Sequence, residues 1–288
     1  MSRRILPAIQ SPTPTYLTMT KREAKLIAAV WAHYRAHGRH DLPWRRTTDP
    51  YRIAVSELML QQTQVARVVP KYQAFIRRFP NTKQLATAPL GDVLALWQGL
   101  GYNRRAQYLH QTAQKLCAAG GRWPRSVEGL QQLPGIGPYT AGAIAAFAYN
   151  QPVSIIETNI RTVYLYHLFP GRTDVSEAEL QDCVSRTVDH ERPREWYWAL
   201  MDYGTYVKER YGNQNQRAAT YQKQSPFRGS VREVRGAVIR ALSSDGWSST
   251  AALLALFPET PERVESVLHS LQQEGLVVPV KNGWSLPH

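Results

Sequence analysis

The chain has 288 residues but only two cysteines and no long apolar run. Cys117 and Cys183 are too few and too far apart for a disulfide framework or a metal site, and they fit a reducing compartment. No apolar run approaches the ~18–20 residues that a membrane span needs. The first residues carry Arg3 and Arg4 but no apolar stretch typical of a signal peptide. We therefore expect a cytoplasmic protein that acts away from membranes, with residues 1–20 as a disordered lead-in.

Acidic residues are also scarce, because 22 of them stand against 35 lysines and arginines, which gives a formal net charge of +13. The excess is confined to residues 1–224, since residues 225–288 contain six basic and six acidic side chains. A basic protein attracts polyanions, because contacts with phosphates release condensed counterions. An acidic membrane surface would be attracted as well, so charge alone does not choose between these partners.

Period-two apolar patterns are missing from the first 210 residues, which predicts an all-α region. Helices separated by short loops with glycine or proline are expected at 21–36, 50–69, 71–78, 82–86, 90–97, 104–118, 126–133, 138–149, 160–168, 176–188 and 194–210. The polar, aromatic-poor residues 213–224 predict a linker. Three further helices, at 229–242, 249–256 and 261–272, precede two short strands around an Asn282-Gly283 turn. Residues 225–288 therefore resemble a winged-helix module.

One tight turn organises the stretch from residue 133 to residue 161. The turn Pro134-Gly135-Ile136-Gly137 follows a short helix, and Pro138 suits the first position of the next one. Bare amides and the positive end of a helix dipole then face whatever lies before the turn, which favours a phosphate. A lone acid, Glu157, follows about twenty residues later. The alternative interpretation is a plain αα-hairpin with a surface glutamate.

A second stretch, residues 56–65, places an acid on an apolar helix face. Glu57 lies one turn from both Ile53 and Leu60, and desolvation there would raise its pKa toward that of a general acid. The alternative is a surface glutamate paired with Arg52 or Arg67. Three glutamines follow Glu57, and their amides suit either base edges or a solvated face; they are Gln61, Gln62 and Gln64.

A third stretch, residues 97–106, combines a glycine-rich turn with an aromatic ring and two arginines. Tyr102 on this turn could stack into a base step while Arg104 and Arg105 hold phosphates. The alternative is a helix connection with a surface tyrosine.

These segments together resemble a known family. They read LPWRRTTDPYRI, SELMLQQTQV, WQGLGYNRRA, LPGIGPYTAGAI and IIETNIR, and their order and spacing are similar to those of the helix-hairpin-helix DNA glycosylase superfamily. The adenine DNA glycosylase branch, which removes adenine mispaired with 8-oxoguanine, is the most similar. The resemblance covers roughly residues 42–207. It implies a two-lobed core over residues 21–212, with a helical barrel and hairpin at 51–149 and a second lobe from 21–50 and 150–212.

The resemblance also implies catalytic roles. Glu57 matches the acid that protonates the adenine ring, and Glu157 stands where the family has an essential aspartate. Asn159 matches a supporting asparagine. Tyr139 stands where bifunctional relatives carry a Schiff-base lysine, which implies a monofunctional hydrolase without lyase activity. This scheme is chemically coherent, because splitting an N-glycosidic bond needs one carboxyl as proton donor and another that stays ionised near the sugar.

Contacts with DNA follow from the same comparison. Gln62 and Tyr102 match residues wedged into the duplex, and Leu60 and Thr63 match positions beside the opposite base. The hairpin amides match a phosphate clamp, whose carbonyls can hold a monovalent cation in relatives. The residues expected to contact DNA are Leu60, Gln61, Gln62, Thr63, Tyr102, Arg104, Arg105, Gly135, Ile136, Gly137 and Thr140.

Three departures from the family pattern limit the transfer. Glutamate at position 157 moves its carboxylate by about 1.5 Å, and misplacement on this scale can cost ~100-fold in rate. Two cysteines cannot supply the four thiolates of an iron–sulfur cluster, so packing must hold that end of the core and no cofactor is expected. The C-terminal residues do not resemble the Nudix-like domain that reads 8-oxoguanine.

We therefore expect a monomeric glycosylase that acts on mismatched double-stranded DNA, in the nucleoid of a bacterium, and releases adenine opposite 8-oxoguanine or guanine. Two alternatives stay open. The target could be another base, such as thymine, uracil or an oxidised adenine, or the protein could bind lesions after its chemistry has lapsed.

Overall fold

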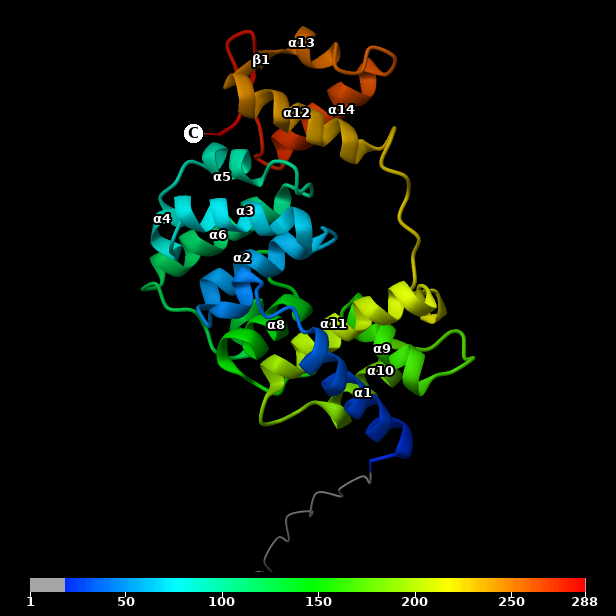
Figure 1. Ribbon diagram of the computed structural model, residues 1–288. Coiled ribbons are helices and arrows are strands. Elements are labelled where there is room, and N and C mark those ends of the chain that lie inside the picture. The colour runs from blue at the N-terminus through cyan, green and yellow to red at the C-terminus, as the bar shows by residue number, and fades with distance from the viewer. Residues whose placement is uncertain (1–18, 288) are drawn as a thin grey trace, which may run out of the picture.

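A computed structural model describes residues 19–287 (Figure 1). The core elements are α1 (Lys21–His37), η1 (Pro43–Arg46), α2 (Pro50–Leu60), α3 (Val65–Arg78), α4 (Thr82–Ala86), α5 (Leu90–Trp97), α6 (Arg104–Ala118), α7 (Val127–Gln131), α8 (Pro138–Tyr149), α9 (Thr158–Leu168), α10 (Glu177–Thr187), α11 (Pro193–Tyr211) and η2 (Gln214–Arg217). The C-terminal elements are α12 (Val231–Asp245), β1 (Trp247–Ser249), α13 (Thr250–Leu254), α14 (Pro261–Gln273), β2 (Val278–Val280) and β3 (Gly283–Ser285).

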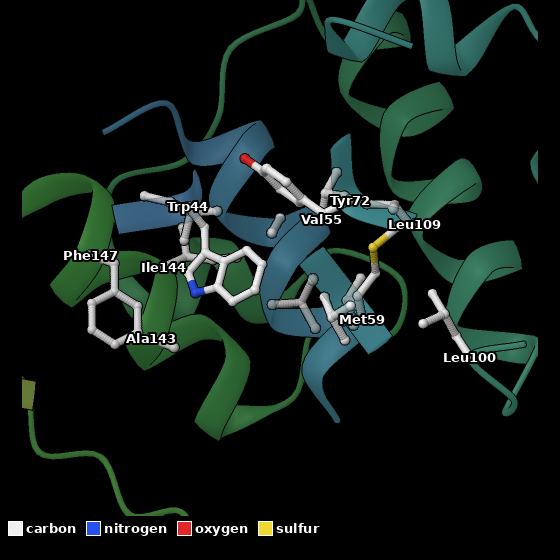
Figure 2. Packing of buried hydrophobic residues seen from close by; sticks show 14 of the residues in the cluster. Trp44, Val55, Met59, Tyr72, Leu100, Leu109, Ala143, Ile144 and Phe147 are labelled. Atoms are coloured by element: carbon white, nitrogen blue, oxygen red, sulfur yellow. The ribbon is translucent and has the colours of Figure 1, made fainter. Parts of the chain in front are cut away.

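The predicted fold class is confirmed: the core is helical and a small α+β part follows it. Helices α2 to α8 pack together, and α1 packs with α9, α10 and α11 on the other side of α8 (Figure 1). Figure 2 shows part of the apolar core between α2 and α8, with Trp44 and Phe147 side by side. The expected lead-in lies almost wholly outside the described residues. No helix within residues 19–287 is both long and apolar enough to cross a membrane.

The helix expected at 50–69 is wrong in one respect, because α2 stops at Leu60 and α3 begins at Val65. The break falls at Gln62, whose φ of 54° is left-handed and cannot continue a helix. Pro70 lies inside α3 instead of ending a helix. Both Pro70 and Ala66 are on the exposed side of α3, where water can satisfy the carbonyl that the proline ring leaves without a donor.

The predicted linker is wrong for its first half, because residues 213–218 pack against α9. Asn215 is buried and donates to Thr162 Oγ1 at 2.9 Å, and Arg217 donates to the carbonyls of Leu165 and Phe169, both at 2.7 Å. Arg217 thus satisfies carbonyls at the end of α9, and Asn215 bonds side-chain and backbone oxygens of its first turns, so the polar character of both residues reflects contacts with α9 rather than solvent exposure. An exposed connection remains only from about residue 219 to residue 230.

The C-terminal part, residues 230–287, contains three helices and a sheet of order β1-β3-β2. The predicted hairpin between β2 and β3 is confirmed, with Asn282 left-handed in its turn, whereas the sequence did not indicate β1. This part docks on α5 and α6 of the core. The Gly91 amide donates to the Pro287 carbonyl at 2.8 Å, and Gln107 Nε2 donates to the Glu274 carbonyl at 2.5 Å.

Candidate active site and nucleic-acid interface

Glu57 is a buried carboxyl at the centre of the candidate site. It lies on α2, is 6% exposed, and accepts a hydrogen bond of 3.1 Å from the Tyr139 hydroxyl of α8. Burial raises the pKa of Glu57 to about 7; the Tyr139 hydrogen bond opposes this rise, and the charge of Glu157 adds to it. Arg52 lies 3.8 Å from Asp49 rather than beside Glu57. The alternative of a surface ion pair at Glu57 is therefore not what the structure shows.

Tyr139 connects the hairpin to this carboxyl. It stands in the first turn of α8, directly after the Gly135–Gly137 turn. Burial, followed by the charges of Glu57 and Glu157, raises the pKa of Tyr139 well above its usual value. The phenol is therefore a neutral hydrogen-bond donor at physiological pH, and it donates to Glu57.

Glu157 is the N-cap of α9. Its Oε1 accepts from the amides of Asn159 at 2.8 Å and Ile160 at 2.9 Å, and its Oε2 accepts from Thr158 Oγ1 at 2.9 Å and Asn159 Nδ2 at 3.3 Å. Four donors thus fix this carboxylate at the positive end of a helix. The family resemblance assigned Glu57, Tyr139, Glu157 and Asn159 to one site. Hydrogen bonds join Glu57 to Tyr139 and Glu157 to Asn159, and the charge of Glu157 acts on both Glu57 and Tyr139.

A cavity of about 30 Å³ lies beside Glu57, which is room for roughly one water molecule. It lies between α2 and η1 on one side and α8 and α11 on the other, and Leu60, which the family resemblance placed beside the opposite base, lines its wall. Its lining residues are Trp44, Arg45, Ile53, Ser56, Glu57, Leu60, Phe147, Trp198 and Met201.

An ion pair closes one side of this cavity, and the sequence did not indicate it. Arg45 Nη1 and Nη2 donate to Asp202 Oδ2 and Oδ1 at 2.7 and 2.9 Å, with both side chains buried. Burial would raise the pKa of Asp202, but hydrogen bonds and charge from Arg45 and Arg39 hold it below its usual value. The two residues are 157 positions apart, so no local pattern links them.

Two exposed tips flank the site. Gln62, between α2 and α3, and Tyr102, before α6, have left-handed φ values of 54° and 49°. Gln224 donates to Gln62 Oε1 at 2.9 Å and also to the Tyr102 hydroxyl, which shows that the two tips are neighbours. Arg232 of α12 donates to the same hydroxyl at 3.1 Å.

The glycine turn before α8 is held from behind by α6. Gly135 has a φ of 69°, and a Cβ added there would lie 2.4 Å from Tyr108 Cβ. Thr112 Oγ1 donates to the Pro134 carbonyl at 2.9 Å. A Cβ added at Gly137 would have no described heavy atom within 4 Å, so the turn has open space in front of it. The Gly137 position is thus suited to close approach by a ligand.

Some residues expected to contact DNA have their polar groups occupied within the protein. The Ile136 amide donates to the Leu133 carbonyl at 3.2 Å. Thr140 is buried and accepts from Gln61 Nε2 at 3.2 Å. Thr63 Oγ1 lies 3.2 Å from the Leu100 carbonyl, so this side chain connects the two tips.

Arg105 is placed differently from the prediction. Arg104 is exposed and near Tyr108 and Glu274, but the Arg105 side chain points inward and the residue is 7% exposed. Its guanidinium donates to backbone carbonyls at the end of α2 and in the turn before α6. The expectation that Arg105 holds a phosphate is contradicted by this burial.

Comparison with known proteins places the chain in a family. Residues 55–186 match the family described as HhH-GPD superfamily base excision DNA repair protein. The adenine DNA glycosylase of Mycobacterium tuberculosis (strain ATCC 25618 / H37Rv) is 33% identical over 308 residues, which cover 98% of each chain. The chain belongs to the adenine DNA glycosylase family. It is 39% identical over 183 residues to the human member, of which it covers 33%, and 37% identical over 182 residues to a Buchnera aphidicola member, of which it covers 50%.

The chain shares its fold with solved structures of other proteins. A thermostable thymine-DNA glycosylase matches with a TM-score of 0.59 at 22% identity, over 67% of this chain and 91% of that one. An endonuclease III–DNA complex matches with a TM-score of 0.56 at 17% identity, over 66% and 88%. At these identities the comparison establishes the fold alone.

Proposed function

We propose that this protein is a monofunctional DNA glycosylase of base-excision repair, which hydrolyses the N-glycosidic bond of adenine opposite 8-oxoguanine or guanine. The observation that carries the proposal is the pairing of Glu57, a buried carboxyl with a pKa of about 7, with the fixed carboxylate of Glu157 near it. Family membership supports the same reaction class.

The two acids suit the two demands of the reaction. Glu57 is partly protonated at neutral pH and can donate its proton to the leaving base. Bond cleavage leaves positive charge on the sugar, and a carboxylate near it stabilises this charge. Glu157 supplies that carboxylate, held rigidly by the α9 amides. Tyr139 carries a hydroxyl instead of an amine, so this position forms no Schiff base and water completes the reaction.

The cavity beside Glu57 is the proposed entrance for the extruded base. At about 30 Å³ it is too small for a purine, so the walls must separate when a base leaves the stack. Leu60 and Met201 are unbranched at Cβ and can change rotamer. Trp44 and Trp198 offer aromatic surfaces against which a base can pack.

We also propose that the protein works as a monomer without an iron–sulfur cluster. Such a cluster needs four thiolates, and the chain has only two cysteines, on the separate helices α6 and α10. The donor set therefore does not fit the group.

The proposal is tested with duplexes that carry one defined mismatch each, incubated with the protein and then heated in alkali to cut abasic sites. Strand cleavage is expected for A opposite 8-oxoguanine or G, and only after alkali. Glu57→Gln should abolish product while duplex binding persists, and the exposed Glu259→Gln should behave as wild type. Cleavage at another base, or retained turnover in Glu57→Gln, would defeat the assignment.

Lapsed chemistry is the second candidate, and the hydrogen bonding of Glu157 favours it. All four of its donors belong to the first turn of α9, so the carboxylate serves its own helix. If the wild type binds mismatches but releases no base, Glu157→Asp decides between the two. Activity gained by the shorter acid would show that Glu157 ended the chemistry.

A further inference from the structure

The two exposed tips are strained in the same way. Gln62 and Tyr102 both have left-handed backbones, a conformation that costs energy for any residue other than glycine. Such strain persists only where the surroundings fix it. The two side chains hydrogen-bond only to exposed groups of Gln224 and Arg232 among the described residues, whereas the strain lies in the backbone, so contacts with the backbone of both turns matter most.

Arg105 acts on that backbone at both tips. Its Nη1 donates to the Gln61 carbonyl at 2.6 Å, and its Nη2 donates to the Gly101 carbonyl at 2.9 Å. These carbonyls belong to the peptide bonds directly before Gln62 and Tyr102. The two arms of one planar guanidinium therefore fix the two left-handed residues at a set separation.

Other contacts of Arg105 anchor this bridge in the core. The guanidinium also donates to the carbonyls of Leu58 and Leu100, and it packs over the rings of Trp97 and Tyr102 at 5.6 and 5.4 Å. Burial lowers the pKa of Arg105 to about 10, so the charge is retained at physiological pH. Its donors face protein carbonyls, which leaves it directed away from solvent.

We infer that Arg105 is a positioning residue, which holds Gln62 and Tyr102 as one rigid pair for insertion into the duplex. This inference rests on the proposed function for the purpose of the pair, but not for its geometry. Lysine at this position would keep the charge and lose the fork, because one ammonium cannot reach carbonyls on both turns with the same geometry.

The first experiment measures the geometry without any substrate. Hydrogen exchange is followed in wild type, in Arg105→Lys and in the control Arg78→Lys. Arg78 is an exposed arginine at the C-terminal end of α3, and it pairs with Asp92 of α5. Arg105→Lys should speed exchange at 61–64 and 99–103 together, with the rest of the chain unchanged. Faster exchange in only one turn, or throughout the chain, would overturn the inference.

The second experiment measures base extrusion apart from chemistry. Each variant is combined with Glu57→Gln and bound to a duplex with 2-aminopurine at the adenine position, whose fluorescence rises when the base leaves the stack. Arg105→Lys should lower the equilibrium constant for base extrusion at least about tenfold. In the protein that keeps Glu57, Arg105→Lys should slow single-turnover base release about 10–100-fold. Affinity for undamaged duplex should change little, because the Arg105 guanidinium is buried and bonded to protein carbonyls.

The salt dependence of binding separates this role from phosphate contact. Arg104→Gln, which removes an exposed cation beside the same turn, should lower the slope of log K against log salt by about 0.9. Arg105→Lys should leave that slope unchanged, and a comparable fall in Arg105→Gln would reassign the residue to phosphate binding.

If Arg105→Lys does not fold, Thr63→Val loosens the same two turns by removing the bond to Leu100. Thr63→Val should then show weaker changes in both hydrogen exchange and base extrusion.

Failure of the proposed function has a different signature. If the wild type released no base, the exchange result at 61–64 and 99–103 would still decide the role of Arg105. If wild type is active and Arg105→Lys matches Arg78→Lys in exchange and extrusion, the inference alone is wrong.

Discussion

Among single residues, burial gives Glu57 a pKa suited to a general acid and lowers the stability of the protein above neutral pH. Its pKa is about 7 in the folded protein against 4.5 in an exposed carboxyl, so the folded state binds the proton more tightly. The contribution of Glu57 to the free energy of unfolding is therefore fully present below pH 4.5 and is lost as the pH rises through 7. Above pH 7 the native state must hold a buried charge, with the Tyr139 hydroxyl as its hydrogen-bond donor.

We predict that Glu57→Gln is as stable as wild type at pH 4.5 and more stable at pH 8. Glutamine stays neutral and can still accept from Tyr139, so it avoids the cost of ionisation. Thermal melts at both pH values measure the difference, with Glu259→Gln as control.

The base-release rate of wild type should fall about tenfold per pH unit above pH 7, because the proton donor is lost. A rate that is flat to pH 9 would show that Glu57 is not the acid.

The sequence predicted the carboxyl pair but not the residues around it. Glu57 was found because its apolar neighbours recur at helical spacing, and Glu157 because the run around it has no other charge. Arg104 and Arg105 look alike in sequence, yet one helical step of 100° turns one to solvent and the other to the core. The Arg45–Asp202 pair depends on how α11 packs against η1, which no local pattern reports.

Among elements, the contact of α9 with α11 positions the fixed carboxylate. Gly204 lies inside α11 and packs against the first turn of α9. A Cβ added at Gly204 would be 2.2 Å from the Asn159 carbonyl oxygen. The two helices can approach this closely because residue 204 has no side chain. Asn159, which donates to Glu157, is therefore held by a backbone contact between helices, and the local sequence of α9 does not show it.

We predict that Gly204→Ala destabilises the protein by about 1–3 kcal/mol, because a backbone atom must move to admit the methyl group. Base release should slow as well, since the first turn of α9 carries Glu157. The matched control is Gly236→Ala inside α12, where an added Cβ meets no described atom within 4 Å. Better helix propensity should stabilise that variant by up to about 1 kcal/mol. Urea unfolding measures both, and equal effects would contradict the packing argument.

Aromatic rings pack together at the end of α11. Tyr206 stacks on Tyr203 at 5.9 Å between ring centroids, and Tyr211 stacks on Tyr166 of α9 at 4.7 Å. His33 of α1 lies 4.9 Å from Tyr206. Three helices thus meet through rings that lie far apart in the chain. The partners of these rings depend on the tertiary fold, which the local sequence does not show.

For the whole molecule, charge and the site lie in the same part of the chain. All of the +13 belongs to residues 1–224, which also carry the hairpin, the two tips and the carboxyl pair. Residues 225–288 carry no net charge, and the C-terminal part within them packs on α5 and α6 beside the tips. Electrostatic attraction of DNA should therefore come from the core, and the C-terminal part should add little to non-specific binding.

We predict that removing cations from the two parts changes salt dependence differently. Lys71 of α3 lies against Gly99 in the turn that carries Tyr102, so Lys71→Gln should lower the slope of log K against log salt by about 0.9. Arg240 and Lys281 are exposed in the C-terminal part, and changing both to glutamine should leave the slope within error. Fluorescence anisotropy of a labelled undamaged duplex between 50 and 200 mM salt measures these slopes. A fall near 1.8 in the double variant would mean that two of the contacted phosphates lie on the C-terminal part, and that DNA is bound by both parts of the chain.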